Sequence, residues 1–216
     1  MSKLLSINVG RPQTLEWKGR SVTTGIVKMP IRGDVLLYMR GVDGDGQADL
    51  KHHGRPFQAA YAYPYEHYGF WQSELGRDDL PLGQFGENFT TEGLLESDVR
   101  IGDVFRVGTA CVQATSFRYP CGKLAMRMQR KDFPALFLNS LRTGWYMRVL
   151  EEGAMKAGDA MELLERDEAA PTIKEMLQIY LQRPVDPDAV REVLAVESLA
   201  EPVRAQFKEL VSGISW

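Results

Sequence analysis

The chain has 216 residues, of which 44% are hydrophobic and 25% are charged, and its formal net charge is −3. These values fit one globular domain, or one domain with a small appendage, and a negative charge does not favour binding to nucleic acid. No apolar run approaches the ~18 residues of a membrane span, and residues 1–9 read as a strand, not as a signal peptide. With two cysteines and no export signal, we expect a cytoplasmic protein with reduced thiols.

Short strand-like runs separated by glycine fill most of the chain before residue 167. They are residues 4–9, 25–28, 35–39, 58–63, 99–107, 109–116, 145–150 and 160–164. The runs 99–107 and 109–116 predict a hairpin that turns at Gly108. Short strands at regular spacing predict a mainly β fold, either a barrel or two packed sheets. A Rossmann fold is disfavoured because strands and helices do not alternate.

Three short helices interrupt these strands. Pro64 suits the first position of a helix that reaches Glu74, with Gly76 just beyond its end. A second short helix is expected directly after Cys121, and a third is expected to begin at residues 132–134.

The chain changes character at Pro171, where three amphipathic helices begin. Thr172 with Glu175, and Ser198 with Glu201, have the spacing of capping boxes at the starts of the first and third helices. Asp186-Pro187 begins the second helix. We therefore predict two domains, residues 1–167 and 171–213. The second is too small to be stable alone, so we expect it to pack on the first domain or on another chain.

Residues 116–124, Ser-Phe-Arg-Tyr-Pro-Cys-Gly-Lys-Leu, carry the first candidate for chemistry. Pro120 ends a predicted strand, and Cys121 then stands at the start of a helix. The partial positive charge of the helix N-terminus, together with Arg118 and Lys123, favours a thiolate at Cys121. The alternative is a buried and inert cysteine.

Charge is unevenly distributed around this cysteine. Residues 118–148 contain seven basic residues and one acidic residue, whereas residues 149–216 contain seven basic and fourteen acidic residues. The net charges are therefore +6 and −7. A basic block of this size suits a small anion such as a phosphate, and a solvated helix face is the alternative.

Residues 41–56 form a glycine-rich acidic loop that leads into His52, His53 and Arg55. The loop lacks the glycine and glutamate that an EF-hand needs at its sixth and twelfth positions. A zinc site made by these histidines with His67 and Cys121 is an alternative, but adjacent histidines of an extended chain point to opposite sides.

Two further motifs suit ligand binding. In residues 85–94, Glu87 and Asn88 offer the donors and acceptors that recognition of a heterocycle requires, although an Asx turn would also explain Asn88. Arg142, Thr143 and Gly144 form a turn before a strand, where a side chain and backbone amides would hold an oxyanion.

Taken in order, these motifs resemble the MOSC family, named after the C-terminal domain of molybdenum-cofactor sulfurase. The motifs are Gly-Asp-Gly-Gln-Ala-Asp, Lys-His-His-Gly, Phe-Gly-Glu-Asn, Thr-Glu-Gly-Leu, Tyr-Pro-Cys-Gly-Lys-Leu and Thr-Gly-Trp-Tyr. The three-helix tail is similar to that of the bacterial YiiM-type branch of this family. The resemblance implies a MOSC-type β-barrel with short helices, and a site for the molybdenum cofactor (molybdopterin).

The resemblance also implies a function. Members of this branch are expected to reduce N-hydroxylated compounds, such as hydroxylaminopurines, to amines, which would detoxify them. The protein is then a molybdenum-dependent oxidoreductase, and a separate reductase supplies its electrons because the chain has no flavin or iron–sulfur motif. A homodimer is compatible with these expectations. The alternatives are a sulfur carrier that uses a Cys121 persulfide and a non-catalytic anion-binding module.

By the same resemblance, Cys121 is the molybdenum ligand, and it is assigned a catalytic role together with His53. The remaining candidates would bind the phosphate or orient the pterin of the cofactor. They are Arg55, Glu87, Asn88, Arg118, Lys123, Arg142, Thr143 and Gly144.

Overall fold

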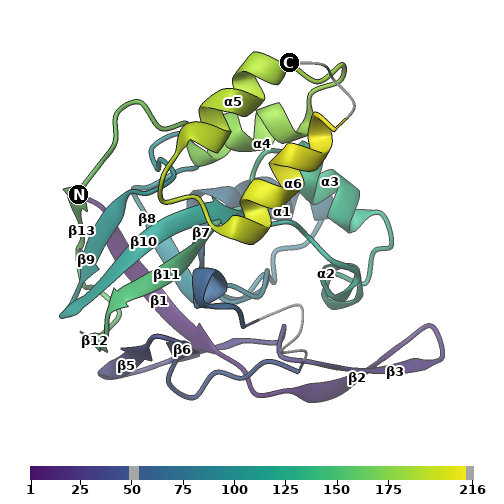
Figure 1. The fold of residues 1–216 in the computed structure, drawn as a ribbon. Coiled ribbons are helices and arrows are strands. Elements are labelled where there is room, and N and C mark those ends of the chain that lie inside the picture. The colour runs from purple at the N-terminus through teal and green to yellow at the C-terminus, as the bar shows by residue number, and fades with distance from the viewer. Residues whose placement is uncertain (49–53, 213–216) are drawn as a thin grey trace.

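A strongly curved sheet of eight strands forms the centre of the molecule (Figure 1). The computed structural model describes residues 1–48 and 54–212. In spatial order, the strands of this sheet are β13 (Met161–Glu165), β9 (Val104–Val107), β10 (Ala110–Phe117), β11 (Trp145–Glu151), β7 (Ala60–Pro64), β8 (Phe89–Glu92), β1 (Lys3–Val9) and β4 (Met29–Ile31).

The sheet curls until its two ends approach each other. All neighbouring strands are antiparallel except β7 and β8, which run parallel. A bridge between Lys3 and Ala160 brings the start of β1 beside the segment that leads into β13. The predicted mainly β architecture is confirmed as a sheet-rich body with several short helices. The bridge at Lys3 is isolated, so among the described residues the sheet curls without closing into a barrel.

In the part of the chain that the structure describes, two small sheets and seven helices complete the fold. β12 (Gly153–Met155), β5 (Val35–Tyr38) and β6 (Gly41–Val42) form one small sheet, and β2 (Gln13–Trp17) and β3 (Arg20–Thr24) form a projecting hairpin. The helices are η1 (Pro56–Gln58), α1 (Glu66–Leu75), α2 (Gly122–Arg127), α3 (Phe133–Asn139), α4 (Ile173–Leu181), α5 (Pro187–Ala195) and α6 (Glu201–Leu210). No helix within residues 1–48 and 54–212 is both long and apolar enough to cross a membrane.

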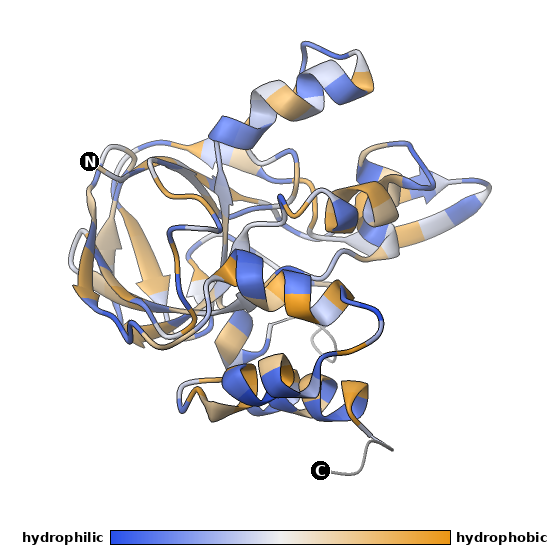
Figure 2. Ribbon diagram, turned by 90° about the horizontal axis from the view of Figure 1, so that it is seen from above, coloured by the Kyte–Doolittle hydropathy of each residue, from blue (hydrophilic) through white to orange (hydrophobic). Residues whose placement is uncertain are grey.

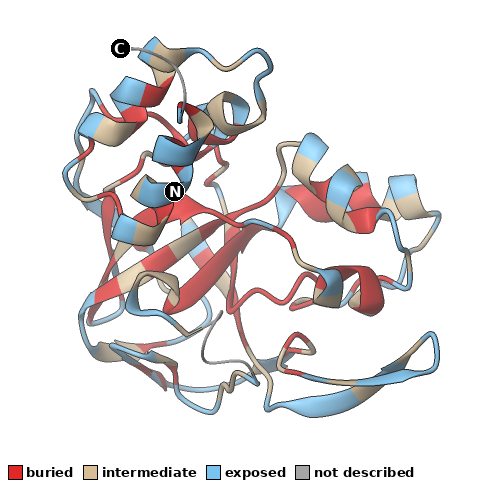
Figure 3. Cartoon of the chain, turned by 45° about the vertical axis from the view of Figure 1, so that its right-hand side comes forward, coloured by how far each residue is buried: buried red, intermediate tan, exposed pale blue. Residues whose placement is uncertain are grey.

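The C-terminal helices share their core with the sheet. Val112 of β10, Met176 of α4, Val193 of α5 and Phe207 of α6 are buried members of the same apolar cluster. The apolar stripe of each helix faces inward and its charged face is exposed, as the colouring of Figures 2 and 3 shows. The three-helix module therefore packs on the main domain, which supplies the apolar partner that a unit of this size requires.

β10 positions the cysteine motif. Its first half alternates between buried and half-buried residues, but its last residues, from Ala114 to Phe117, are all buried. The register with β11 shifts between Ala114 and Ser116, and the hydroxyl of Thr115 donates to the carbonyl oxygens of Phe57 and Tyr146. A bulge of this kind changes the direction of a strand. Cys121, four residues after the end of β10, therefore lies at the end of the sheet.

Most predicted elements are confirmed. The hairpin at Gly108, the helices after Cys121 and Asp132, and the glycine C-cap at Gly76 are all present. The capping box of Thr172 and Glu175 is complete, since each side chain accepts a hydrogen bond from the backbone amide of the other residue.

Three local predictions are wrong. Residues 25–28 are not a strand, because the Thr24 hydroxyl accepts the amide hydrogen of Ile26 and turns the chain out of β3. Pro64 ends β7, and α1 begins only at Glu66. Ser198 does not cap α6, whose N-cap residue is Ala200.

The β2–β3 hairpin was not predicted. Its two turn residues, Lys18 and Gly19, both have positive φ angles, 50° and 73°. Two consecutive left-handed residues are typical of the tight turn that matches the twist of a hairpin. The usual sequence signal of this turn, asparagine or aspartate before glycine, is absent because Lys18 precedes Gly19.

Candidate functional site

Cys121 lies in the connection between β10 and α2, at the place where two hollows meet. It is the N-cap residue of α2, with an extended backbone (φ −121°, ψ 173°), and it is half-buried. Cys111 and Cys121 are not joined by a disulfide bond. Cys121 lines both hollows.

The narrow hollow has a volume of about 100 Å³. Its described lining residues are Thr24, Gly25, Ile26, Lys28, Asp45, Gly46, Gln47, Ala48, Gly54, Gln58, Tyr61, Gly86, Asn88, Arg118, Tyr119, Cys121, Lys123 and Tyr146. Two backbone segments meet closely at its rim, where a Cβ on Gly25 would lie 2.2 Å from the carbonyl oxygen of Gly46. Only glycine permits this approach, so the acidic loop is held against the end of β3.

Arg118 supplies a buried positive charge in this hollow. Its guanidinium lies 4.7 Å from the ring centroid of Tyr61 and 5.7 Å from that of Phe137. Although the residue is only 6% exposed, its Nη1 has no hydrogen-bond partner within residues 1–48 and 54–212. Buried donors are almost always paired in native proteins. A guanidinium left in this state suits an anionic ligand that accepts from Nη1.

The surroundings of Arg118 keep it charged. Burial acts to lower its pKa, but Tyr61, Tyr146 and Cys121 oppose burial, and the pKa is raised overall. Burial also raises the pKa values of Tyr61 and Tyr146, so both phenols are neutral hydrogen-bond donors and acceptors near pH 7. The narrow hollow thus presents a fixed cation among neutral phenols.

A buried ion pair braces the opposite wall of the narrow hollow. Lys28 Nζ lies 2.5 Å from both carboxylate oxygens of Asp45. Asp45 also accepts the amide hydrogen of Gly10 at 2.8 Å and a side-chain amide hydrogen of Asn88 at 2.9 Å. Burial is the main cause that lowers the pKa of Lys28, and Asp45 acts in the opposite direction. The acidic loop is therefore a structural brace.

Asn88 lines the narrow hollow as part of this brace. Its Nδ2 donates to Asp45 and, at 3.3 Å, to the carbonyl oxygen of Asn8, while its Oδ1 accepts the amide hydrogen of Tyr61 at 3.3 Å. Both acceptors of the Asn88 side-chain amide group are therefore atoms of the protein itself. Its predicted contact with a pterin stays a prediction, and what the structure shows is a wall residue.

The wide hollow has a volume of about 660 Å³. Its described lining residues are Trp17, Val22, Arg55, Phe57, Gln58, Ser116, Phe117, Tyr119, Cys121, Gly122, Lys123, Met126, Tyr146, Pro202, Val203 and Gln206. It shares Gln58, Tyr119, Cys121, Lys123 and Tyr146 with the narrow hollow. The two hollows therefore meet at Cys121 and Lys123, with Arg118 on the narrow side and Arg55, which is exposed, on the wide side.

Glu87 lies in the interior and is absent from the described linings of both hollows. Its carboxylate accepts hydrogen bonds from the amides of Gly83 and Phe85 and from the hydroxyls of Tyr68 and Thr90. Burial raises its pKa, and these donors limit the rise. Glu87 fixes the loop that carries Asn88, so the structure gives it a structural place and not a contact with a ligand in either hollow.

The structure does not bring Arg142, Thr143 and Gly144 to either hollow, and their assignment as cofactor-binding residues stays a prediction. The Gly144 amide donates to Glu96 at 2.7 Å, and the Thr143 carbonyl oxygen accepts from the hydroxyl of Tyr61 at 2.7 Å. Arg142 lies over the ring of Phe70, at 4.0 Å from the centroid. None of the three is among the described lining residues of the two hollows. The turn instead fixes the phenol of Tyr61.

The zinc alternative receives no support from the described residues. His67 is buried, and its Nε2 lies 2.7 Å from a carboxylate oxygen of Glu96. This nitrogen is therefore already engaged by Glu96. No group of three or more His, Cys, Asp or Glu side chains within residues 1–48 and 54–212 is arranged to hold a metal ion. His52 and His53 lie outside the described residues.

Sequence reasoning missed several residues of the site. Lys28, Gln58, Tyr61 and Tyr146 line the narrow hollow, and Trp17 lines the wide one. Tyr146 could have been found, because it is the last residue of the Thr-Gly-Trp-Tyr motif. The others lie in segments that only the folded chain brings to Cys121.

Comparisons with known proteins agree with this architecture. A family model described as the MOSC domain matches residues 49–162, and one described as the YiiM-like, 3-alpha helix domain matches residues 171–213. The crystal structure of YiiM from Geobacillus stearothermophilus superposes with a TM-score of 0.82 at 33% identity, covering 98% of this chain and 100% of that chain.

Curated relatives are similar over most of the chain. YflK of Bacillus subtilis is 43% identical over 94% of this chain and 92% of its own length, and YiiM of Escherichia coli is 34% identical over 88% and 86%. A Gibberella moniliformis protein named a reductase is 34% identical over 76% of this chain, but the match covers only 29% of that protein.

Proposed function

Because the chain belongs to the MOSC domain family, we propose that it binds the molybdenum cofactor where the two hollows meet and reduces N-hydroxylated compounds to amines. The observation that carries this proposal is the pairing of Cys121 with Arg118. A half-buried thiol and a buried guanidinium, whose Nη1 has no hydrogen-bond partner among the described residues, line the same narrow hollow.

The residues that are present fit the chemistry of this cofactor. A thiolate is a soft ligand that suits molybdenum, and a guanidinium suits a phosphate. The narrow hollow, at about 100 Å³, has room for a phosphate-sized group but not for a whole pterin. The cofactor must therefore also occupy part of the wide hollow, where Lys123 adds a second cation.

When bound, the cofactor supplies a two-electron centre that can remove oxygen from nitrogen. Cys121 would hold the metal at the junction of the hollows. Arg118 would balance the negative charge of the cofactor, and its place on Tyr61 and Phe137 fixes the guanidinium before any ligand enters. Tyr146 keeps its phenolic proton because burial raises its pKa, so its hydroxyl is available as a donor beside Cys121.

The reaction consumes two electrons and two protons and releases water with each amine formed. A separate redox protein is proposed as the electron donor. The resemblance to a fungal reductase over 29% of that protein supports reductive chemistry for this domain.

The test compares Cys121→Ser with Cys111→Ser in protein made by a host that produces the cofactor. Cys111 is a matched control because it is also half-buried but is absent from the described linings of both hollows. Wild type and Cys111→Ser should contain molybdenum and pterin and reduce hydroxylaminopurine with a reduced dye as the electron source. Cys121→Ser should lose activity, because the metal loses its protein ligand.

Other outcomes of the same experiment would refute the proposal. Cyanide-releasable sulfur on the wild type without molybdenum, lost in Cys121→Ser, would identify a sulfur carrier. Phosphate binding with no cofactor and no labile sulfur would identify an anion-binding module.

A further inference from the structure

Residues 118–121 join β10 to α2 and belong to neither a strand nor a helix. This cysteine segment begins with the buried Arg118 and ends with Cys121, the N-cap residue of α2. At its start, the amide of Arg118 donates a hydrogen bond of 3.3 Å to the carbonyl oxygen of Gly144. A hydrogen bond at the first residue does not fix the fourth, so the place of Cys121 also depends on what holds the middle of the segment.

Tyr119, in the middle of the cysteine segment, contacts the three-helix module. Its ring lies edge-on to the ring of Tyr180 of α4, with 5.9 Å between the centroids and an interplanar angle of 78°. Tyr180 also contacts Phe117 of β10 at 5.3 Å and Phe207 of α6 at 5.8 Å between centroids. Aromatic pairs at these distances attract each other. Tyr180 therefore joins the cysteine segment to the core of the module.

Core packing explains only part of this aromatic cluster. Phe207 is fully buried and Phe117 is 5% exposed, so their contacts with Tyr180 belong to the core shared by the module and the sheet. Tyr119, in contrast, is 54% exposed and lines both hollows. Because a half-exposed ring gains little from burial, the main consequence of its contact with Tyr180 is to fix where Tyr119 lies beside the hollows.

Pro120 transmits the position of Tyr119 to Cys121. The pyrrolidine ring fixes the φ angle of a proline and also restricts the residue before it to extended conformations. Pro120 is itself buried, which limits its movement further. Few free torsion angles therefore separate the backbone of Tyr119 from that of Cys121.

We infer that Tyr180 is a positioning residue for Cys121, and that the three-helix module holds the cysteine segment in place through the contact between Tyr180 and Tyr119. Tyr180 is absent from the described linings of both hollows, so it acts through Tyr119 and takes no part in the reaction. The inference rests on the proposed function for the role of Cys121 and adds what determines its position. The module then does more than cover the sheet.

The first measurement uses the full chain made in a host that does not synthesise the cofactor. The protein is treated with iodoacetamide, and mass spectrometry of its peptides follows the alkylation of Cys121 and Cys111 separately. In Tyr180→Ala, alkylation of Cys121 should be about three- to tenfold faster, because loss of an aromatic contact shifts the equilibrium between a held and a released segment by such a factor. Cys111 is the internal reference, since it lies within β10, paired on both sides.

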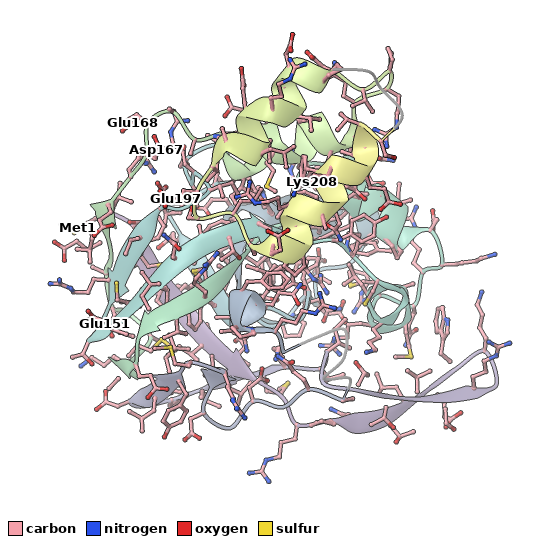
Figure 4. All side chains as sticks on the ribbon, in the orientation of Figure 1. Met1, Glu151, Asp167, Glu168, Glu197 and Lys208 are labelled. Atoms are coloured by element: carbon pink, nitrogen blue, oxygen red, sulfur yellow. The ribbon has the colours of Figure 1, made fainter. Side chains whose placement is uncertain are left out.

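Three variants separate positioning from a general loss of stability. Tyr180→Phe keeps the ring and should restore the rate to within about twofold of the wild type. Thr172→Ala weakens the same helix by removing half of its capping box but leaves the ring contact in place, so the rate for Cys121 should stay within about twofold of the wild type. Lys208→Ala, on an exposed residue of α6 (Figure 4), should leave the rate unchanged.

Tyr119→Ala tests the other side of the contact, and it serves in place of Tyr180→Ala if that variant does not fold, because Tyr119 is half-exposed. Tyr119→Ala should also speed the alkylation of Cys121. Where both residues act through one contact, the double variant should react no faster than Tyr119→Ala alone. Effects that multiply in the double variant would show that Tyr180 does not act through Tyr119, and the inference would be wrong.

The loaded protein provides a second readout. Tyr180→Ala should retain less molybdenum per folded chain after dialysis than Thr172→Ala, and Tyr180→Phe should recover the loss. If Cys121 is alkylated no faster in Tyr180→Ala than in the wild type, or if Thr172→Ala speeds it equally, the inference is wrong, even where Cys121-dependent reduction is intact. If alkylation depends on Tyr180 but the loaded wild type holds no molybdenum and reduces no hydroxylaminopurine, the positioning role stands and the reductase proposal is wrong.

Discussion

The two hollows that meet at Cys121 are built in opposite ways. The narrow hollow has walls of buried groups bonded to one another, such as Lys28 with Asp45 and Asn88, and its residues all come from the main domain. The wide hollow is assembled from the hairpin, η1, β10, β11, α2 and α6, and its lining combines apolar side chains such as Phe57 and Val203 with polar ones such as Gln58 and Lys123. Charged groups that are fixed before binding suit a cofactor, which is the same molecule in every reaction cycle. A wall made of separate elements can change its sequence and shape more easily between related proteins.

The largest expected effect comes from breaking the brace of the narrow hollow. Asp45→Asn leaves the ammonium of Lys28 buried without a carboxylate, and loss of one partner of a buried ion pair costs ~3–5 kcal/mol of unfolding free energy. Urea denaturation measures this loss. Asp43→Asn, on an exposed residue of the same loop, should change the unfolding free energy by less than ~0.5 kcal/mol. Equal stability of the two variants would show that the brace is unimportant.

Arg118→Met tests the charge of the narrow hollow. Methionine keeps an apolar side chain on Tyr61 and Phe137 but removes the guanidinium, whose Nη1 has no partner within the described part of the chain. We expect cofactor affinity to fall by ~1.5–3 kcal/mol, the usual contribution of a hydrogen bond to a charged group. The cofactor-free protein should also lose stability, because the interactions of the guanidinium with Tyr61, Phe137 and Tyr146 are lost, so cofactor retention is compared per folded chain. Unchanged cofactor retention in Arg118→Met, measured as molybdenum per chain after dialysis, would remove Arg118 from the site.

Thr172→Ala tests the module that carries one wall of the wide hollow. The change removes one half of the capping box of α4, which costs ~1 kcal/mol of unfolding free energy. Urea denaturation measures the cost, and Ser198→Ala serves as its control because Ser198 does not cap α6. Since α4 packs in the core shared with β10, the loss should appear in a single cooperative transition. A separate transition for the module would contradict the shared core.

The pH dependence of stability tests the support beneath the narrow hollow. The folded-state pKa of Glu87 is raised above the ordinary value of 4.5, mainly by burial. The folded state therefore binds this proton more tightly than the unfolded state, and the stabilisation that results is present below pH 4.5 and is lost as the pH rises through the raised pKa. Relative to Glu87→Gln, the wild type should lose stability as the pH increases from 4.5. Parallel stability curves for the two proteins would contradict the raised pKa.

The order of motifs and the local chemistry of the chain were sufficient for much of this picture. Cys121 between a strand and a short helix, the capping box at Thr172, and the three-helix tail were all predicted, because each depends on neighbours within a few positions of the sequence. The same is true of the positive charge at Arg118, whose basic neighbourhood is visible in the sequence.

Only the tertiary structure decided which polar residues face a ligand. Lys28 and Asp45 are 17 positions apart, and Asp45 and Asn88 are 43 positions apart, yet each pair is joined by hydrogen bonds. The amide of Gly144 looks available in the sequence but is taken by Glu96, which lies 48 positions away. Burial and long-range hydrogen bonds determine whether a polar group is spent on the fold or left for a ligand, and neither is encoded in local sequence patterns.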